Sequence, residues 1–377
     1  MHGNFLREGS YYKGVNTKTG DKFNYNDENF ATIVDFPGKK IVLNPIAVTG
    51  SIDDAKFDLR DFGVVTPAED QGNNGACWAF GTTGAFESAF LKATGITLDI
   101  SNNNIQNSGL RYSMYGKPSL TEDGYIFSGL SYILSWLGVV NTENDKYDEL
   151  GKISPIMFTD NSYHITDAVI VDTSNINSMK DALIKYGALT VIVNGANPNN
   201  AYYNKDTKAS YCNNASLANH FVTVVGWDDN FSRSNFKIDP GHDGAWICKN
   251  SWGTDWGDKG YFYLSYYDAP LKQEKAVGYV INNTEVYDRL YQYDIAAFEG
   301  DYMYNTKGND IIYKNTYTSI EGDKVAAVGT YFYAANQNYK ITIFVNSKQV
   351  YTQSGKSKFK GFETVKLNKK SCCRQKC

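Results

Sequence analysis

The sequence contains no apolar run of the roughly 18 to 20 residues that a bilayer span requires. Its start, MHGNFLREGSYYKG, also lacks the apolar core of a secretory signal. The chain also lacks a large excess of either charge, because 37 Lys and Arg against 41 Asp and Glu give a net charge of −4. A chain so close to neutrality has no broad attraction for a phosphate backbone, so we expect neither a nucleic-acid partner nor a membrane span.

Cysteine and histidine are scarce, with six and four residues. Three of the cysteines are isolated, and the other three crowd into the final SCCRQKC. This spacing is not that of a disulfide framework, and no second Cys or His pair near the end completes a zinc site. We therefore expect residues 371–377 to form a solvated, cysteine-containing tail, and we expect no metal and no organic cofactor.

What the chain does contain is enough apolar surface for a large core. Hydrophobic residues make up 42% of the chain and charged residues 21%. Its length of 377 residues exceeds the roughly 100 to 200 residues of one typical domain. The aromatic fraction of 15% comes mostly from 29 Tyr and 20 Phe, which favour strands. The composition predicts a globular, strand-rich protein of more than one domain.

Apolar periodicity predicts helices before strands. Helical spacing covers three segments, 78–95, 125–138 and 178–187. Strand-like runs follow as ALTVIVN from Ala188, HFVTVVGW from His220, AWICKN from Ala245 and GYFYLSYYD from Gly260. Helices followed by sheet indicate the α+β class.

Composition also changes along the chain and predicts four regions. Residues 1–50 have weak periodicity and are expected to form an extension or linker, and residues 51–277 form the main domain. Residues 285–370 alternate strictly and are expected to form a separate all-β domain before the tail. The net charge is +5 over 285–377 and −9 over the rest, which supports a boundary near residue 285.

The stretch DQGNNGACWAF carries the strongest chemical signal. Cys77 stands where a glycine-containing loop enters a helix, and the positive end of the helix dipole favours the nucleophilic thiolate. A lone cysteine at a helix start is more often a small buried hydrophobe, so the assignment needs partners. His220 is the best placed of the four histidines to act as acid and base, and Asn250 can orient the second ring nitrogen.

These segments resemble the papain-like cysteine peptidases, with QG…GACWAF, NHFVTVVGW and KNSWGTDWGDKGYF matching the family's three motifs. His220 follows Cys77 by 143 residues, inside the family's range of about 130 to 150. Asn250 follows Cys77 by 173 residues, outside that range, which the polar insertion DDNFSRSNFKIDPGHDG explains. The resemblance covers about residues 55 to 268 and implies a two-lobed fold, a helical lobe and then a β-barrel-like lobe.

The same resemblance implies a role for each matching residue. Cys77 would be the nucleophile, His220 the acid and base, and Asn250 the residue that orients the imidazole. Gln71 would donate a hydrogen bond to the oxyanion, and Trp252 would shield the hydrogen bond between His220 and Asn250. The chain departs from the family at position 74, where Asn stands in place of a usual disulfide-bonded cysteine.

The C-terminal segments YQYD, TYFY and YKITIFV resemble the lectin-like domain that follows the papain-like domain in some prokaryotic surface proteins. This resemblance implies an extracellular or cell-surface, adhesin-like location and contact with cell-envelope polysaccharide. A Tyr-rich sandwich that only packs on the enzyme is an equal alternative. The missing signal segment conflicts with a surface location and favours a chain that is part of a longer product.

The function predicted from these residues is peptide-bond hydrolysis through a thioacyl-enzyme, with a protein or peptide as substrate. Two rivals stay open at this point. A transglutaminase-like acyl transferase also uses Cys before His, but Gln71 and the Asn-Ser-Trp-Gly motif disfavour it. A surface adhesion or carbohydrate-binding protein could carry an inert peptidase-like domain, which the complete Cys-His-Asn set disfavours.

Overall fold

The structure is a computed structural model that describes residues 3–8, 11–16, 22–26, 32–34, 38–108, 126–136, 138–147, 162–196, 199–282, 287–292 and 314–372. Helices come first and most of the sheet follows, as the α+β prediction requires. The predicted tail falls largely outside the described residues, because only its first two positions lie within them.

The central element is helix α1 (Cys77–Thr94), which the sequence predicted almost to the residue. It is buried on every side, with only Lys92 and Ala93 partly exposed, as expected for a helix that is apolar all round. Gly95 ends it in the left-handed conformation (φ 70°) and its N–H bonds the carbonyl of Leu91. Helices α2 (Asn102–Gln106) and α3 (Ile126–Leu134) pack on α1 and complete the helical lobe.

One eleven-stranded sheet runs through the molecule, in the order β15-β18-β6-β13-β7-β10-β11-β12-β9-β8, with β5 paired to β10. The strands of residues 51–280 are β5 (Lys56–Asp58), β6 (Asp167–Asp172), β7 (Leu189–Val193), β8 (Tyr203–Asn204), β9 (Ala209–Ser210), β10 (His220–Asp228), β11 (Ala245–Lys249), β12 (Tyr261–Ser265) and β13 (Lys275–Val280). Helix α4 (Ile176–Tyr186) follows β6, α5 (Ala269–Gln273) precedes β13, and short 3₁₀ helices cover Leu59–Phe62, Ala215–Leu217 and Arg233–Asn235.

Two apolar cores lie on opposite faces of this sheet. Ala168 and Val277 belong to the core that contains α1, whereas their neighbours Val169 and Ala276 belong to the core that contains α4. Successive strand residues point to opposite faces, so β6 and β13 separate the two cores. This arrangement gives the two lobes, and Cys77, the first residue of α1, is one of the buried residues of the core that contains α1.

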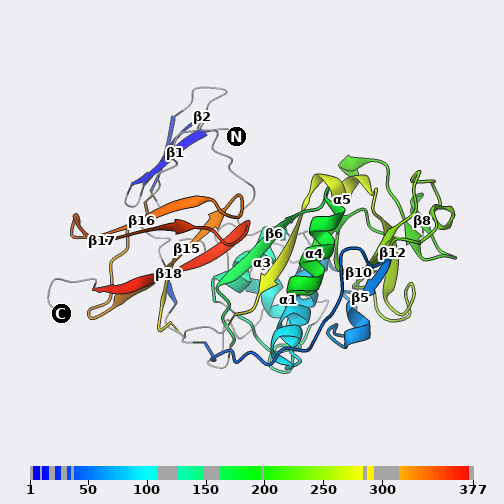
Figure 1. Ribbon diagram of the computed structural model, residues 1–377, viewed down its shortest axis with the longest axis horizontal. Coiled ribbons are helices and arrows are strands. Elements are labelled where there is room, and N and C mark those ends of the chain that lie inside the picture. The colour runs from blue at the N-terminus through cyan, green and yellow to red at the C-terminus, as the bar shows by residue number, and fades with distance from the viewer. Residues whose placement is uncertain are drawn as a thin grey trace.

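The C-terminal strands are β14 (Leu290–Gln292), β15 (Lys324–Phe332), β16 (Asn338–Val345), β17 (Lys348–Lys356) and β18 (Gly361–Cys372). Two of them, β15 and β18, continue the main sheet. Gly361 and Phe362 of β18 pair with Val169 and Ala168 of β6, and β15 pairs with β18, while β16 and β17 form a separate hairpin. In Figure 1 these strands lie at one end of the molecule and β8 and β12 at the other. The boundary near residue 285 stays a prediction, but the sheet crosses it.

The structure also contains strands that the sequence patterns did not reveal. Strands β1 (Gly3–Glu8), β2 (Tyr11–Asn16) and β3 (Lys22–Asn26) form a small sheet within the predicted extension, and β4 (Thr32–Val34) pairs with β14. Strand β6 was missed as well. Further along, Ile41 is fully buried in the helical-lobe core, and the N–H groups of Asn44 and Ile46 bond carbonyls at the end of α1. Residues 38–50 therefore pack on the main domain.

The described residues contain neither a membrane-spanning helix nor a cluster of metal ligands. They contain no helix that is both long and apolar enough to cross a bilayer. In the same residues, no group of three or more His, Cys, Asp or Glu side chains is arranged as a metal site.

Candidate active site

Cys77 is the first residue of α1, and its side chain is buried. One turn later the carbonyl of Gly81 accepts hydrogen bonds from the hydroxyls of Thr190 on β7, at 2.8 Å, and Thr223 on β10, at 3.3 Å. Gly84 permits this close approach, because a Cβ there would lie 2.8 Å from the Thr223 hydroxyl. The contacts fix the start of α1 against β10, whose first residue is His220.

His220 and Asn250 form a buried hydrogen-bonded pair. Nε2 of His220 lies 2.7 Å from Oδ1 of Asn250, and both side chains are at most 5% exposed. The indole of Trp252 lies over the imidazole, with ring centroids 4.7 Å apart. The structure therefore brings together three of the predicted site residues, from β10 and from the segment after β11.

The hydrogen bonds also fix the tautomer of His220. The backbone N–H of Ser251 donates to Oδ1 of Asn250 at 2.9 Å, which identifies that atom as the amide oxygen. A carbonyl oxygen only accepts, so Nε2 of His220 must carry the proton. In the neutral ring the lone pair is then on Nδ1, the nitrogen that can take a proton from a thiol.

Gln71 reaches this pair through a short antiparallel contact between two segments. The N–H of Gln71 bonds the carbonyl of Ser251 at 2.8 Å, and the N–H of Gly253 bonds the carbonyl of Glu69 at 2.9 Å. The Gln71 amide is held at both ends: the Ser251 hydroxyl donates to Oε1 at 2.5 Å, and Nε2 donates to the carbonyl of Asn74 at 2.8 Å. An amide nitrogen has two N–H groups, so one remains for a ligand.

Two residues in this contact were missed from the sequence. Ser251 bonds both Asn250 and Gln71, and the hydroxyl of Tyr147 donates to the Gln71 carbonyl at 2.7 Å. Ser251 could have been suspected from its place beside Asn250. Nothing in the pattern around Tyr147 indicates that it reaches a residue 76 positions earlier.

The sequence model of the family described as papain family cysteine protease matches residues 54–281, more than half of the chain. The chain belongs to this family. Its curated relatives include cysteine proteinase 2 of Zea mays, 28% identical over 210 residues (55% of this chain and 54% of the relative). Cathepsin K of Gallus gallus is 28% identical over 213 residues (56% and 58%). The chain thus spans somewhat more than half the length of these relatives.

Solved structures support the papain-like fold beyond the family domain. The cysteine protease and lectin-like domains of Cwp84, a surface layer associated protein of Clostridium difficile, match with a TM-score of 0.67 at 21% identity, over 89% of this chain and 76% of that one. Clostridial cysteine protease Cwp84 after propeptide cleavage matches with 0.65 at 23% identity, over 84% and 80%. Such coverage includes the C-terminal strands, so the predicted papain-like fold with an added β region is confirmed.

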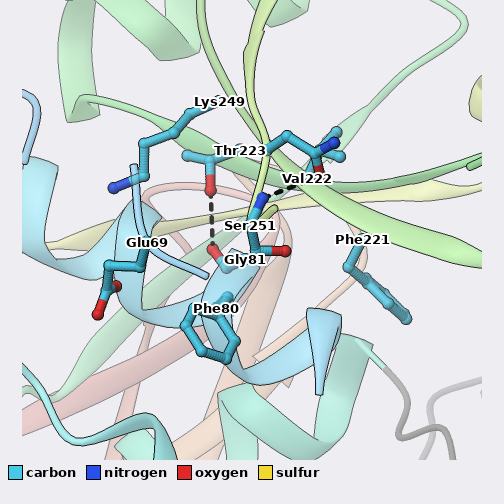
Figure 2. Close-up of a pocket in the computed structure, with 9 residues that line it drawn as sticks. Glu69, Phe80, Gly81, Phe221, Val222, Thr223, Lys249 and Ser251 are labelled. Atoms are coloured by element: carbon cyan, nitrogen blue, oxygen red, sulfur yellow. Dashed lines mark hydrogen bonds between the residues drawn. The ribbon is translucent and has the colours of Figure 1, made fainter. Parts of the chain in front are cut away.

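A buried group of charges lies directly behind Asn250 in this papain-family chain. Lys249 donates to the carbonyl and hydroxyl of Thr66 and to the carbonyl of Pro67, at 2.9 to 3.1 Å. Glu87 of α1 accepts from the Thr66 hydroxyl at 2.6 Å and from the N–H of Ile100 at 2.8 Å. Figure 2 shows Glu69 and Lys249 on the same side of a small cavity and Phe221 on the opposite side. The positive charge of Lys249 thus acts on two carboxyl groups, those of Glu69 and Glu87.

Burial raises the pKa of Glu87 from 4.5 to about 7, and the Lys249 charge only partly offsets this. The folded chain therefore holds a proton that the unfolded chain has lost, between about pH 4.5 and 7. The stability that the protonated Glu87 contributes is fully present below about pH 4.5. As the pH rises to about 7, that contribution is lost and the free energy of unfolding falls by about 3 kcal/mol.

We expect Glu87→Gln, which keeps the neutral form at all pH values, to remove this part of the pH dependence. The measurement is urea unfolding at several pH values between 4.5 and 8. The exposed Glu143→Gln serves as the matched control and should follow the wild type. A wild-type slope that persists in Glu87→Gln would contradict the assignment.

The other described thiols are poor nucleophiles. Cys77, Cys212 and Cys248 are free and buried. Burial raises the pKa of Cys212, and it raises the pKa of Cys248 well above its usual value. Cys212 and Cys248 are both fully buried.

We therefore expect Cys77 to be alkylated first at mildly acidic pH, because of the three buried thiols Cys77, Cys212 and Cys248 it alone begins a helix. The check is iodoacetamide treatment of folded protein at pH 6, followed by peptide mapping. Cys77→Ala should abolish the rapid phase. Rapid labelling at Cys212 or Cys248 instead would refute the prediction.

Proposed function

We propose that this chain is a cysteine endopeptidase that hydrolyses peptide bonds through a thioacyl-enzyme. The observation that carries the proposal is the buried pair of His220 and Asn250, 2.7 Å apart under Trp252, next to a helix that begins with a cysteine. The acid-base group is oriented, its tautomer is set, and the thiol stands at the positive end of a helix.

The chemistry follows from these atoms. Nδ1 of His220 takes the Cys77 proton, and the thiolate attacks the carbonyl carbon of the substrate. The resulting oxyanion accepts hydrogen bonds from the Cys77 N–H and from the second Nε2–H of Gln71. His220 returns its proton to the leaving amine, so the C–N bond breaks and a thioester forms. Water then attacks the thioester with His220 as base, which releases the acid and restores the thiol.

Gln71→Ala is expected to lower kcat by about ten- to a thousand-fold and to change KM much less, because its N–H acts where charge develops in the transition state. Steady-state kinetics on a fluorogenic peptide measure both constants. Ser251→Ala is the companion variant: it frees Oε1 of Gln71 and should give a smaller loss of kcat. Wild-type kcat in Gln71→Ala would reject its role at the oxyanion.

The test of the proposed function compares the wild type with Cys77→Ala on an unstructured protein substrate, with and without a primary amine. New carboxyl termini, formed only by the wild type and blocked by an epoxide thiol trap attached to Cys77, are the expected result. Products that carry the added amine in place of carboxyl termini would indicate the transglutaminase-like rival. Labelling of Cys77 without any turnover would indicate an inert domain.

The site of action that we propose is the cell surface, with a protein substrate there and with cell-envelope polysaccharide bound by the C-terminal β region. The support is the fold shared with a surface layer associated protein that has a lectin-like domain. Residues 51–277 would carry the chemistry and residues 285–370 the attachment. Sedimentation of the Cys77→Ala protein with purified cell envelopes tests this part, and protein that stays in the supernatant would reject it.

A further inference from the structure

Helix α2 is polar and yet buried. It begins with three successive asparagines, Asn102, Asn103 and Asn104, and all three side chains are buried. Burying an amide costs free energy unless the amide is hydrogen-bonded, so such a run is expected to hold other parts of the chain. The hydrolysis mechanism uses none of these side chains, but their partners lead to its oxyanion donor.

The first asparagine links α2 to the segment that carries Gln71. Nδ2 of Asn102 donates to the carboxyl group of Glu69 at 3.2 Å, and its Oδ1 accepts from the hydroxyl of Thr83 on α1 at 2.8 Å. Glu69 stands two residues before Gln71, and its carbonyl accepts from the N–H of Gly253. Asn102 therefore ties the approach to Gln71 to helix α1.

The next two asparagines hold a second segment. Nδ2 of Asn103 donates to Oδ1 of Asp145 at 2.8 Å, and Nδ2 of Asn104 donates to its Oδ2 at 3.2 Å. The hydroxyl of Ser101, which caps α2, donates to the Asp145 carbonyl at 2.5 Å. Both the carboxyl group and the backbone of this buried aspartate are thus tied to α2. Tyr147 follows two residues later.

Tyr147 joins the two segments at Gln71. Its hydroxyl donates to the Gln71 carbonyl at 2.7 Å, and its ring meets the ring of Phe80 edge-on, with centroids 5.0 Å apart. Phe80 lies on α1, three residues after Cys77. The helix that begins with the nucleophile therefore braces the tyrosine, whose hydroxyl holds the segment of the oxyanion donor.

This hydrogen bond matters because of the peptide unit that it holds. The Gln71 carbonyl belongs to the peptide that joins Gln71 to Gly72, and Gly72 has φ 60°. Glycine adopts either sign of φ readily, so nothing in the backbone itself prevents this peptide from rotating. The Gly72 N–H bonds Oδ1 of Asp70 at 2.9 Å, but that bond is exposed, whereas the bond from Tyr147 is partly buried. The tyrosine thus supplies the more protected of the two restraints.

The orientation of this peptide decides where the oxyanion donor lies. The Gln71 side chain starts from the residue whose backbone the peptide fixes. Its amide is already tied to Ser251 at Oε1 and to the Asn74 carbonyl at Nε2, so the direction of the remaining N–H follows the backbone. A misplacement of about 1 Å in a group of this kind can cost about 100-fold in rate.

We propose that Tyr147, held by the asparagines of α2 through Asp145, is a positioning residue for the oxyanion donor Gln71. It acts only through Gln71 and takes no part in the proton transfers. The inference rests on the proposed peptidase function, because only a reaction that forms an oxyanion depends on this placement. Iodoacetamide provides the contrast: the Cys77 thiolate attacks its saturated carbon, the C–I bond breaks, iodide leaves and no oxyanion forms.

The test is Tyr147→Phe in the full chain, which removes the hydroxyl and keeps the ring. We expect kcat for a fluorogenic peptide to fall by about five- to fiftyfold, with KM changed by less than about twofold. The rate of Cys77 alkylation by iodoacetamide should stay within about twofold of the wild type, because that reaction needs no oxyanion donor. In the Gln71→Ala background the same substitution should lower kcat by less than about twofold, because the group through which it acts is gone.

Two further variants accompany it. Asp145→Asn replaces a carboxyl oxygen by an amide nitrogen that cannot accept from the asparagines of α2, and it should lower kcat by at least about threefold. Tyr351→Phe is the matched control, because it removes another partly buried hydroxyl, bonded to Gln353 in the hairpin β16–β17. Its kcat should equal that of the wild type.

Three results for Tyr147→Phe would overturn the inference: wild-type kcat, an equal fall in kcat and alkylation rate, or an undiminished fall in kcat in the Gln71→Ala background. Wild-type kcat in Asp145→Asn would remove α2 from it. Any of these results beside normal hydrolysis by the wild type rejects the positioning role alone. Absent hydrolysis by a wild type whose Cys77 is still alkylated rejects the proposed function, and the positioning role with it.

Discussion

His220→Ala should lower kcat/KM for a peptide substrate by about 10³- to 10⁶-fold, the largest effect expected of any substitution outside Cys77 itself. Without the imidazole, no group accepts the thiol proton and none protonates the leaving amine. The fold should be kept, because the substitution leaves the backbone pairing of β10 with β7 unchanged. Kinetics and circular dichroism of the same preparation check both parts.

Asn250→Ala should be at least about tenfold milder than His220→Ala, because the amide acts only through the ring that it orients. Losing Oδ1 leaves Nε2 of His220 without its acceptor, so the productive tautomer becomes less populated. The matched control is His242→Ala, which removes an exposed imidazole whose ring lies tilted against Tyr267. Activity retained in His220→Ala, or lost equally in His242→Ala, would remove His220 from the mechanism.

Most of the candidate site could be predicted from the sequence. Cys77, His220, Asn250, Gln71 and Trp252 each stand in a local motif, and the structure places the last four around one another. Ser251 was missed because its importance comes from a hydrogen bond to Gln71, 180 residues away in the chain. A sequence pattern describes neighbours along the chain and does not encode such pairings.

The fold shows the same division between local and long-range order. Helix α1 and strand β10 were predicted because their apolar residues follow the periods of helix and strand over many positions. Strands β1, β2 and β3 were missed because their polar, Gly- and Asn-containing sequences show weak alternation. The pairing of β18 with β6 joins segments about 190 residues apart, and strictly alternating strands can equally well form a separate sheet.

Lys249 was also missed from the sequence. It stands between Cys248 and Asn250, in a motif from which only Asn250 and Trp252 were assigned a role. Its ammonium is buried and donates to Thr66 and Pro67. Burial lowers the pKa of Lys249, and the carboxyl groups of Glu87 and Glu69 offset only part of that lowering. A lone lysine at the end of an apolar strand is the signal that could have marked it. Its contacts reach the segment before Gln71 and helix α1, so it joins the two lobes behind the site.

Lys249→Met is expected to destabilise the folded chain by about 3 to 5 kcal/mol at pH 8, because it leaves buried carboxyl groups without their cation. The loss should shrink as the pH falls. Below about pH 7 Glu87 takes up its proton, and removal of Lys249 raises its pKa further, so less uncompensated charge remains at acidic pH. Urea unfolding at pH 5 and pH 8 measures both values, with the exposed Lys237→Met as control.

The double variant Lys249→Met, Glu87→Gln decides whether charge is the cause. If the destabilisation at pH 8 comes from an unpaired Glu87 carboxylate, then neutralising that residue should recover part of it, with a coupling of about 1 to 3 kcal/mol between the two positions. If it comes instead from the hydrogen bonds that Lys249 donates to the Thr66 and Pro67 carbonyls, the two losses should simply add. Equal losses at pH 5 and pH 8, together with strict additivity, would show that the lysine acts by packing and hydrogen bonding and that the buried charge of Glu87 has no part in joining the lobes.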